Sequence, residues 1–137
     1  MQLLSVLVIE DDPQMRRLLR SMLVQSGVEK VGEAEDGKTG VQKFMEEQYD
    51  VVMLDIGLPD MDGLDLLATL KRLKKDAFVV LVTGDDSIES IQTAISSGSN
   101  GYVVKPCSKE KITDVINNYV LTSNAARDLL KDPDFPL

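Results

Sequence analysis

Carboxylates follow two separate apolar runs in this chain, each at the point where the run stops. The acids are Glu10, Asp11 and Asp12 after residues 3–9, and Asp55 after residues 51–54. Apolar runs without polar alternation predict strands that are covered on both faces. Because ligands and chemistry collect at the carboxyl ends of strands in open α/β sheets, we expect these acids to lie at one candidate site.

Two further apolar runs end in residues that could complete such a site. Thr83 and Gly84 follow residues 78–82, and Lys105 follows residues 102–104. Each of these residues alone has an ordinary structural explanation as a cap, a turn or a surface charge. Together they would offer a hydroxyl, an approachable backbone and an ammonium group close to the carboxylates, which suits the binding of a phosphoryl group.

Grouped carboxylates repel one another, and keeping them ionised requires a compensating cation. Mg²⁺ fits best, because it accepts carboxylate and carbonyl oxygens and keeps waters and a phosphoryl group among its ligands. Asp55 could then act as a nucleophile that takes a phosphoryl group and forms an acyl phosphate. Mg²⁺ and Lys105 would neutralise charge on the phosphoryl oxygens.

The elements that must position these residues alternate along the chain. The predicted strands are residues 3–9, 31–34, 51–54, 78–82 and 102–104, and the predicted helices begin near Pro13, Gly37, Gly63, Ile88 and Ser108. Five strands that alternate with five helices predict an α/β fold with a parallel sheet and helices on both faces.

Side chains that can cap helices mark several of the helix starts. Asp12 and Ser108 are the expected caps of the first and fifth helices, and Asp86 with Glu89 resembles a capping arrangement for the fourth. Apolar residues at three- and four-residue steps mark the core face of each helix. We expect polar outer faces on the fourth and fifth helices, without a large exposed apolar patch.

Four segments together resemble the receiver domain of response regulators in two-component signalling. They are Glu10-Asp11-Asp12, the stretch from Leu54 to Gly63, Val82-Thr83-Gly84, and Tyr102-Val103-Val104-Lys105-Pro106. The resemblance extends from about residue 3 to residue 120. It implies a flavodoxin-like, doubly wound sheet of five parallel strands in the order 2-1-3-4-5.

The resemblance also implies a role for each residue of the site. Asp55 is the phosphoacceptor, and the metal ligands are Glu10 (mostly through a bound water), Asp11, Asp55 and the backbone carbonyl of Gly57. Thr83, Gly84 and Lys105 bind the phosphoryl group, and the Lys105–Pro106 bond is cis. Thr83 and Tyr102 form the switch: Tyr102 turns inward as Thr83 moves, which changes the surface of the fourth helix, fifth strand and fifth helix. The competing interpretation is that Tyr102 only packs at the edge of the core.

Composition excludes several classes of function. The chain has 137 residues, a formal net charge of −8, no histidine and one cysteine, Cys107. The negative charge argues against direct nucleic-acid binding, and the lack of histidine excludes imidazole bases and histidine metal ligands. One cysteine excludes an internal disulfide. No apolar run approaches the length that crosses a bilayer, so we expect a soluble cytoplasmic protein without membrane contact.

The favoured function is a signalling switch, not an enzyme, that takes a phosphoryl group from a histidine kinase or a histidine phosphotransfer protein. It would show Mg²⁺-dependent self-phosphorylation and autodephosphorylation, as a monomer or a weak phosphorylation-dependent dimer. An aspartyl phosphatase is disfavoured, because such enzymes usually carry a second Asp where this chain has Gly57. A nucleotide-binding module is disfavoured, because no glycine-rich loop follows the first strand.

The domain boundaries are predicted as a receiver domain at residues 1–121 and a tail at residues 122–137. The tail either extends the last helix to about residue 130 or is a flexible end, and Pro133 and Pro136 exclude helical interior there. A third alternative to the favoured function, besides the phosphatase and the nucleotide-binding module, is an N-terminal receiver of a larger regulator whose DNA-binding or enzymatic domain follows residue 137.

Overall fold

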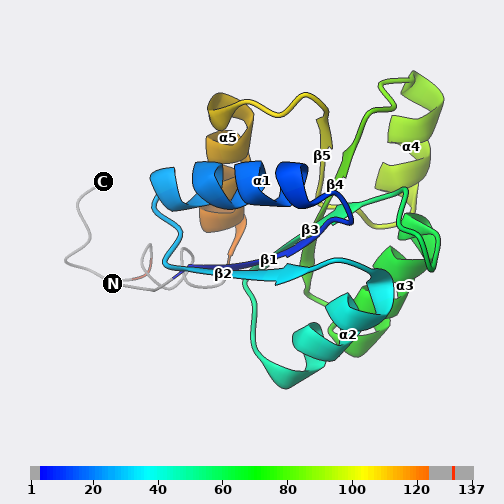
Figure 1. Cartoon of the computed structure of the whole chain (residues 1–137), viewed down its shortest axis with the longest axis horizontal. Helices are drawn as coiled ribbons and strands as arrows, with labels where there is room; N and C mark the ends of the chain where they lie inside the picture. The colour runs from blue at the N-terminus through cyan, green and yellow to red at the C-terminus, as the bar shows by residue number, and fades with distance from the viewer. Residues whose placement is uncertain (1–3, 124–130, 132–137) are drawn as a thin grey trace.

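A five-stranded parallel sheet forms the centre of the molecule, with helices on both faces (Figure 1). The structure is a computed structural model, and it describes residues 4–123 and 131. The strands are β1 (Ser5–Ile9), β2 (Lys30–Ala34), β3 (Val51–Asp55), β4 (Phe78–Thr83) and β5 (Gly101–Val104). The helices are α1 (Pro13–Gln25), α2 (Gly37–Glu46), α3 (Gly63–Leu73), α4 (Ile88–Ser96) and α5 (Lys109–Thr122).

The sheet has the order β2-β1-β3-β4-β5, which confirms the predicted flavodoxin-like topology. The strands β3 and β4 each continue one residue beyond the apolar run that predicted them, so that Asp55 and Thr83 are the last residues of their strands. The expected helical extension of the tail falls on residues 124–130, outside the described residues, and the domain boundaries stay a prediction.

Each face of the sheet has its own hydrophobic core. On one face, α1 and α5 pack against β1, β3 and β4 in a cluster that includes Leu19, Leu23, Ile112, Ile116, Val6, Val51 and Val80. On the other face, α3 packs against the same three strands in a cluster that includes Leu66, Leu67, Leu70, Leu7, Val52 and Leu81. Alternate residues of each central strand therefore face opposite cores, which explains why these strands are apolar without alternation.

The predicted caps of α1 and α5 are confirmed. A side-chain oxygen of Asp12 accepts a hydrogen bond from the backbone N–H of Gln14, and Ser108 accepts one from that of Lys111. For α4 the predicted cap was wrong, because the capping residue is Ser87 and not Asp86. The reason is local: Asp85 accepts hydrogen bonds from the Ser87 N–H and the Ser90 hydroxyl, and this turn brings Ser87 to the start of the helix.

The expectation of a polar outer face on α4 was also wrong. Ile88 is 74% exposed and Ile95 is 60% exposed, whereas Ala94 is fully buried. The helix packs beside β5, the edge strand of the sheet, and Ala94 is the residue of α4 that is buried in the core (Figure 1). A helix at a sheet edge can carry the apolar periodicity of a core helix and still leave part of that face in water.

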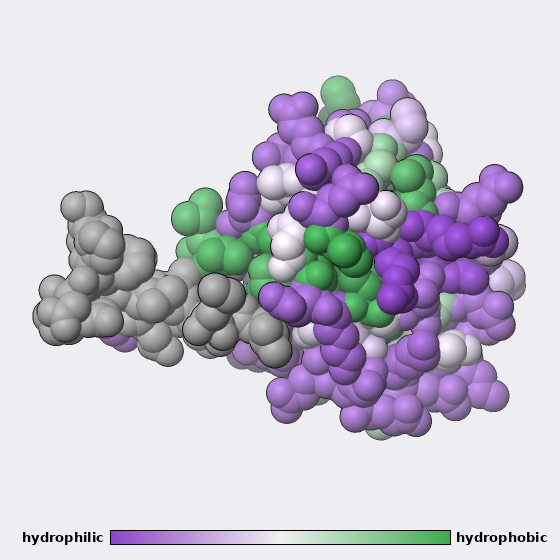
Figure 2. Space-filling model, turned by 60° about the vertical axis from the view of Figure 1, so that its left-hand side comes forward, coloured by the Kyte–Doolittle hydropathy of each residue, from purple (hydrophilic) through white to green (hydrophobic). Residues whose placement is uncertain are grey.

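One face of the molecule is largely polar. Figure 2 shows a face on which hydrophilic side chains predominate and hydrophobic ones gather mainly near the middle. Within the described residues, no helix combines the length and apolar character needed to cross a membrane.

The capping of α4 can be tested by substitution. Ser87→Ala removes the acceptor for the Ser90 N–H, which lies 3.2 Å from the Ser87 hydroxyl. We expect the free energy of unfolding to fall by about 1 kcal/mol, the usual cost of losing such a cap. Asp86→Ala, the matched control one residue earlier, should change it by less than about 0.5 kcal/mol. Urea unfolding measures both variants, and an equal loss in the two would contradict the assignment.

Candidate functional site

The register of the sheet places the predicted site residues at one edge. Ile9 pairs with Leu54, Asp55 with Val82, and Thr83 with Val104. Glu10 and Lys105, which directly follow Ile9 and Val104, therefore lie at the same carboxyl edge as Asp55 and Thr83. The parallel order of four strands gathers residues that are up to 95 positions apart in the chain.

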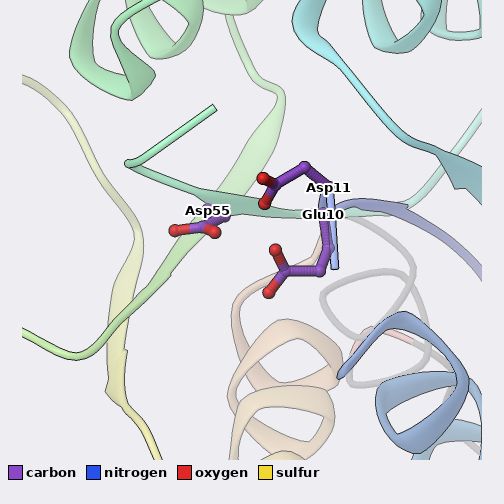
Figure 3. A group of neighbouring side chains, drawn as sticks. All are labelled: Glu10, Asp11 and Asp55. Carbon is purple, nitrogen blue, oxygen red and sulfur yellow. The ribbon is translucent and has the colours of Figure 1, made fainter. Parts of the chain in front are cut away.

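Three carboxylates converge at this edge. Figure 3 shows the side chains of Glu10, Asp11 and Asp55 pointing into a common space. Each has a carboxylate oxygen within 4.8 Å of one from each of the others. Glu10 is buried, Asp55 is largely buried and Asp11 is exposed, so that the cluster opens to solvent on the Asp11 side.

Lys105 lies between two of these acids. Its ammonium nitrogen is 2.7 Å from Oε1 of Glu10 and 3.3 Å from Oδ2 of Asp55. The side chain of Glu10 is only 2% exposed, and a carboxylate buried so deeply requires a partner of opposite charge. Lys105 thus compensates one of the three negative charges directly.

The environment separates the pKa values of the two buried acids. Burial raises the pKa of Glu10 to about 7, with a further contribution from its hydrogen bond to Asp55. Burial alone would also raise the pKa of Asp55, but hydrogen bonds from Glu10 and the Gly57 N–H, together with Lys105, outweigh it and lower the pKa. Of these two acids, Asp55 therefore stays ionised more readily, as a nucleophile must.

The residues present fit a hard divalent cation. The cluster offers only oxygen atoms, which is the donor set that Mg²⁺ prefers, and one lysine leaves it with excess negative charge. The exposed Asp11 side leaves room for water and substrate oxygens as further ligands. Glu10, Asp11 and Asp55 are thus the carboxylates that could hold the ion.

Gly57 lies next to the cluster in the loop after β3. Its N–H donates to Oδ1 of Asp55 at 3.1 Å, which orients the carboxylate. The loop closes where the N–H of Gly63 donates to the carbonyl of Ile56 at 3.0 Å. A Cβ on Gly63 would lie 2.5 Å from the Cα of Ile56, so this closure depends on glycine.

Thr83, Gly84 and Tyr102 surround the opening from β4 and β5. The Thr83 side chain is buried, and its hydroxyl accepts a hydrogen bond from the Asp85 N–H. A Cβ on Gly84 would meet no atom within 4 Å, so the backbone there is approachable. The hydroxyl of Tyr102 donates to the carbonyl of Asp85 at 2.7 Å, and the Lys105–Pro106 bond is cis, as the resemblance implies.

The loop between Leu58 and Gly63 carries no chemistry that its sequence predicts, but Asp60 in this loop has a structural role. Its two carboxylate oxygens accept hydrogen bonds from the N–H groups of Gly37 and Lys38, at 2.8 and 3.0 Å. The loop of the site is therefore fastened to the beginning of α2. Nothing in the sequence around Asp60 predicts these partners, because they are backbone groups more than twenty residues earlier in the chain.

Comparison with known proteins assigns the chain that carries this site to a family. The chain matches the response regulator receiver domain over residues 6–117. This chain belongs to the response regulator receiver domain family. Membership of this family implies phosphorylation-dependent signalling. It indicates a signalling protein and not a classical enzyme.

Two curated relatives of this receiver domain are chemotaxis proteins. The chain is 31% identical over 112 residues to chemotaxis protein CheY of Bacillus subtilis, covering 82% of this chain and 93% of that protein. It is 34% identical over 119 residues to CheY of Halobacterium salinarum, covering 87% and 98%.

Solved structures show the same fold. A response regulator receiver domain protein from Clostridium thermocellum superposes with a TM-score of 0.81 at 26% identity, over 93% of this chain and 99% of that one. The receiver domain of Francisella response regulator 1452 superposes with a TM-score of 0.80 at 29% identity, over 87% and 98%.

The raised pKa of Glu10 predicts that the stability of the metal-free receiver domain depends on pH. The pKa of Glu10 rises from 4.5 to about 7 on folding, so that the folded chain holds this proton longer than the unfolded chain does. Glu10 therefore contributes fully to the stability of the fold at pH values below its pKa in the unfolded chain. This contribution is lost as the pH rises through its pKa in the folded chain. Carbon NMR of the Glu10 carboxyl with chelator present should show a midpoint near 7.

Added Mg²⁺ should lower this midpoint, because a nearby cation favours the ionised carboxylate. A Glu10 midpoint that is the same with and without Mg²⁺ would contradict a cation site here.

Proposed function

We propose that this receiver domain is a switch in which Asp55 accepts a phosphoryl group from a phosphohistidine of a partner kinase or histidine phosphotransfer protein. The convergence of Asp55 with Lys105 at 3.3 Å, inside a cluster of three carboxylates, is the observation that carries this proposal. The chain has no histidine, so these 137 residues cannot themselves supply the phosphohistidine.

The proposed cation is Mg²⁺, held by Glu10, Asp11, Asp55 and the backbone carbonyl of Gly57. Glu10, whose Oε1 is bound to Lys105, would act mostly through a metal-bound water. When bound, the ion supplies positive charge to the oxygens of the phosphoryl group in transfer. The oxygen-only donor set and its uncompensated charge support this assignment.

The transfer is a displacement at phosphorus. A carboxylate oxygen of Asp55 attacks the phosphorus atom while the bond from phosphorus to the donor imidazole nitrogen breaks, and the imidazole leaves with the bonding electrons. The lowered pKa keeps Asp55 ionised for this attack. Lys105 then pairs with the phosphoryl oxygens, Thr83 donates its hydroxyl to them, and Gly84 lets the backbone approach.

The same residues are proposed to give Mg²⁺-dependent self-phosphorylation from small donors and autodephosphorylation, without the rapid turnover of an aspartyl phosphatase. An aspartyl phosphatase uses a general acid two residues after its nucleophile, and Gly57 offers none. A nucleotide site after β1 is disfavoured for a second reason. The side chain of Asp12 already occupies the N–H of Gln14 at the start of α1.

The output step is proposed to begin at Thr83 and Tyr102. In this structure the Tyr102 hydroxyl is bound to the carbonyl of Asp85, whose N–H is bound to the Thr83 hydroxyl. When Thr83 turns to the phosphoryl group, it releases the Asp85 segment, and Tyr102 turns inward. The surface of α4, β5 and α5 changes, and a protein partner senses the change, with the receiver domain a monomer or a weak phosphorylation-dependent dimer.

Substitution of Asp55 tests the acceptor. With acetyl phosphate and Mg²⁺, or with a phosphorylated kinase, wild type should gain a label that hydroxylamine removes, and Asp55→Asn should stay at background. Asp62→Asn is the matched control in the same loop. Its side chain caps α3 by accepting the Leu64 N–H, a role that Asn fills as well, and it should label like wild type. Label on Asp55→Asn at the wild-type level would refute the proposal.

Fluorine NMR of fluorotyrosine tests the switch, because the chain has three tyrosines. On phosphorylation the Tyr102 resonance should move, whereas those of Tyr49 and Tyr119 should move much less. Thr83→Ala should reduce the Tyr102 shift at equal occupancy of Asp55. Tyr102→Ala should leave labelling of Asp55 intact and weaken binding of the output partner. A Tyr102 resonance that stays fixed in fully phosphorylated protein would contradict the switch.

A further inference from the structure

Arg16, on the second turn of α1, reaches back to the acidic turn that precedes the helix. Its Nη1 donates a hydrogen bond to the backbone carbonyl of Glu10 at 2.7 Å and lies 3.5 Å from the carbonyl of Asp11. These two residues carry carboxylates of the cluster in Figure 3. The Arg16 side chain is only 19% exposed, so this contact is sheltered from competing water.

A second contact holds the Arg16 side chain from β2. Its Nε lies 3.6 Å from Oε1 of Glu33, and Oε2 of the same carboxylate is 2.9 Å from Nη1 of Arg20. Arg20 is one turn later on α1 and does not contact the acidic turn within the described residues. The two arginines therefore share one partner, but only Arg16 touches the backbone of the site.

We infer that Arg16 is a positioning residue for the cation site, acting through the backbone of Glu10 and Asp11. The inference rests on the proposed function, because it assumes that these residues hold the cation. A guanidinium presents several N–H donors in a rigid plane, so it can fix the direction of a carbonyl while Glu33 fixes the guanidinium. Fixing these carbonyls fixes where both carboxylates point.

Charge and positioning predict opposite results for removal of Arg16. The guanidinium is positive, and its loss would by Coulomb attraction alone strengthen the binding of a cation to the cluster. Loss of the contact with the Glu10 carbonyl would let the acidic turn shift and would weaken cation binding. The sign of the change in Mg²⁺ affinity therefore separates the two effects.

The experiment is a titration of the unphosphorylated, full chain with MgCl₂ at constant ionic strength, followed by backbone amide NMR. Arg16→Met should bind Mg²⁺ about tenfold more weakly than wild type, as is typical for loss of a group that orients metal ligands. Arg16→Lys keeps the charge and one donor and should be intermediate. Arg20→Met, which also loses a bridge to Glu33, should bind within about twofold of wild type or more tightly.

A readout without metal accompanies the titration. Before Mg²⁺ is added, the amide resonances of Asp11 and Asp12 should move in Arg16→Met and stay in place in Arg20→Met. The inference is overturned if Arg16→Met binds as tightly as wild type or more tightly, or if both arginine variants weaken binding equally. If Arg16→Met does not fold, wild-type affinity in Arg16→Lys overturns it instead. Wild type that shows no saturable Mg²⁺ binding would refute the proposed cation site itself, a distinct outcome.

Discussion

The contact of the Lys105 ammonium with two buried carboxylates is the interaction on which the site depends. Glu10 directly follows β1 and Asp55 ends the neighbouring strand β3, and without a cation between them their burial would be unfavourable. The lysine neutralises one charge and leaves the cluster negative. A receiver domain needs this balance, because the folded chain must tolerate the acids while it still attracts a divalent cation.

The fold supplies the rigidity that this charge balance needs. Asp55 ends β3 and Thr83 ends β4, and the strand residues immediately before each of them are buried. Their positions are set by the ladder of the sheet and by two cores, one on each face. The loop after β3 is fixed separately, by Asp60 at the beginning of α2 and by the close approach of Gly63 to Ile56.

The sequence predicted what depends on local pattern. Unalternated apolar runs located the strands, and the acid or lysine after each run identified the edge where Glu10, Asp55 and Lys105 meet. Predictions from the sequence were wrong where the local structure depends on contacts with residues that the sequence pattern does not identify. The turn made by Asp85 moved the cap of α4 to Ser87, and the edge position of α4 left Ile88 exposed. The partners of Asp60, and the Glu10 carbonyl that Arg16 binds, are likewise backbone groups, which no residue type signals.

The contacts that connect the site to the rest of the fold are made by charged side chains. Lys105 and Arg16 bind groups of the site from other elements, whereas Asp60 binds the beginning of α2 from the loop of the site, and each does so with a charge. Hydrogen bonds to charged groups are stronger than neutral ones and demand a defined direction. A transferred phosphoryl group and a cation would add charge at the centre of this arrangement. The elements that respond would be those held least firmly, and α4, with a single fully buried side chain in Ala94, is one of them.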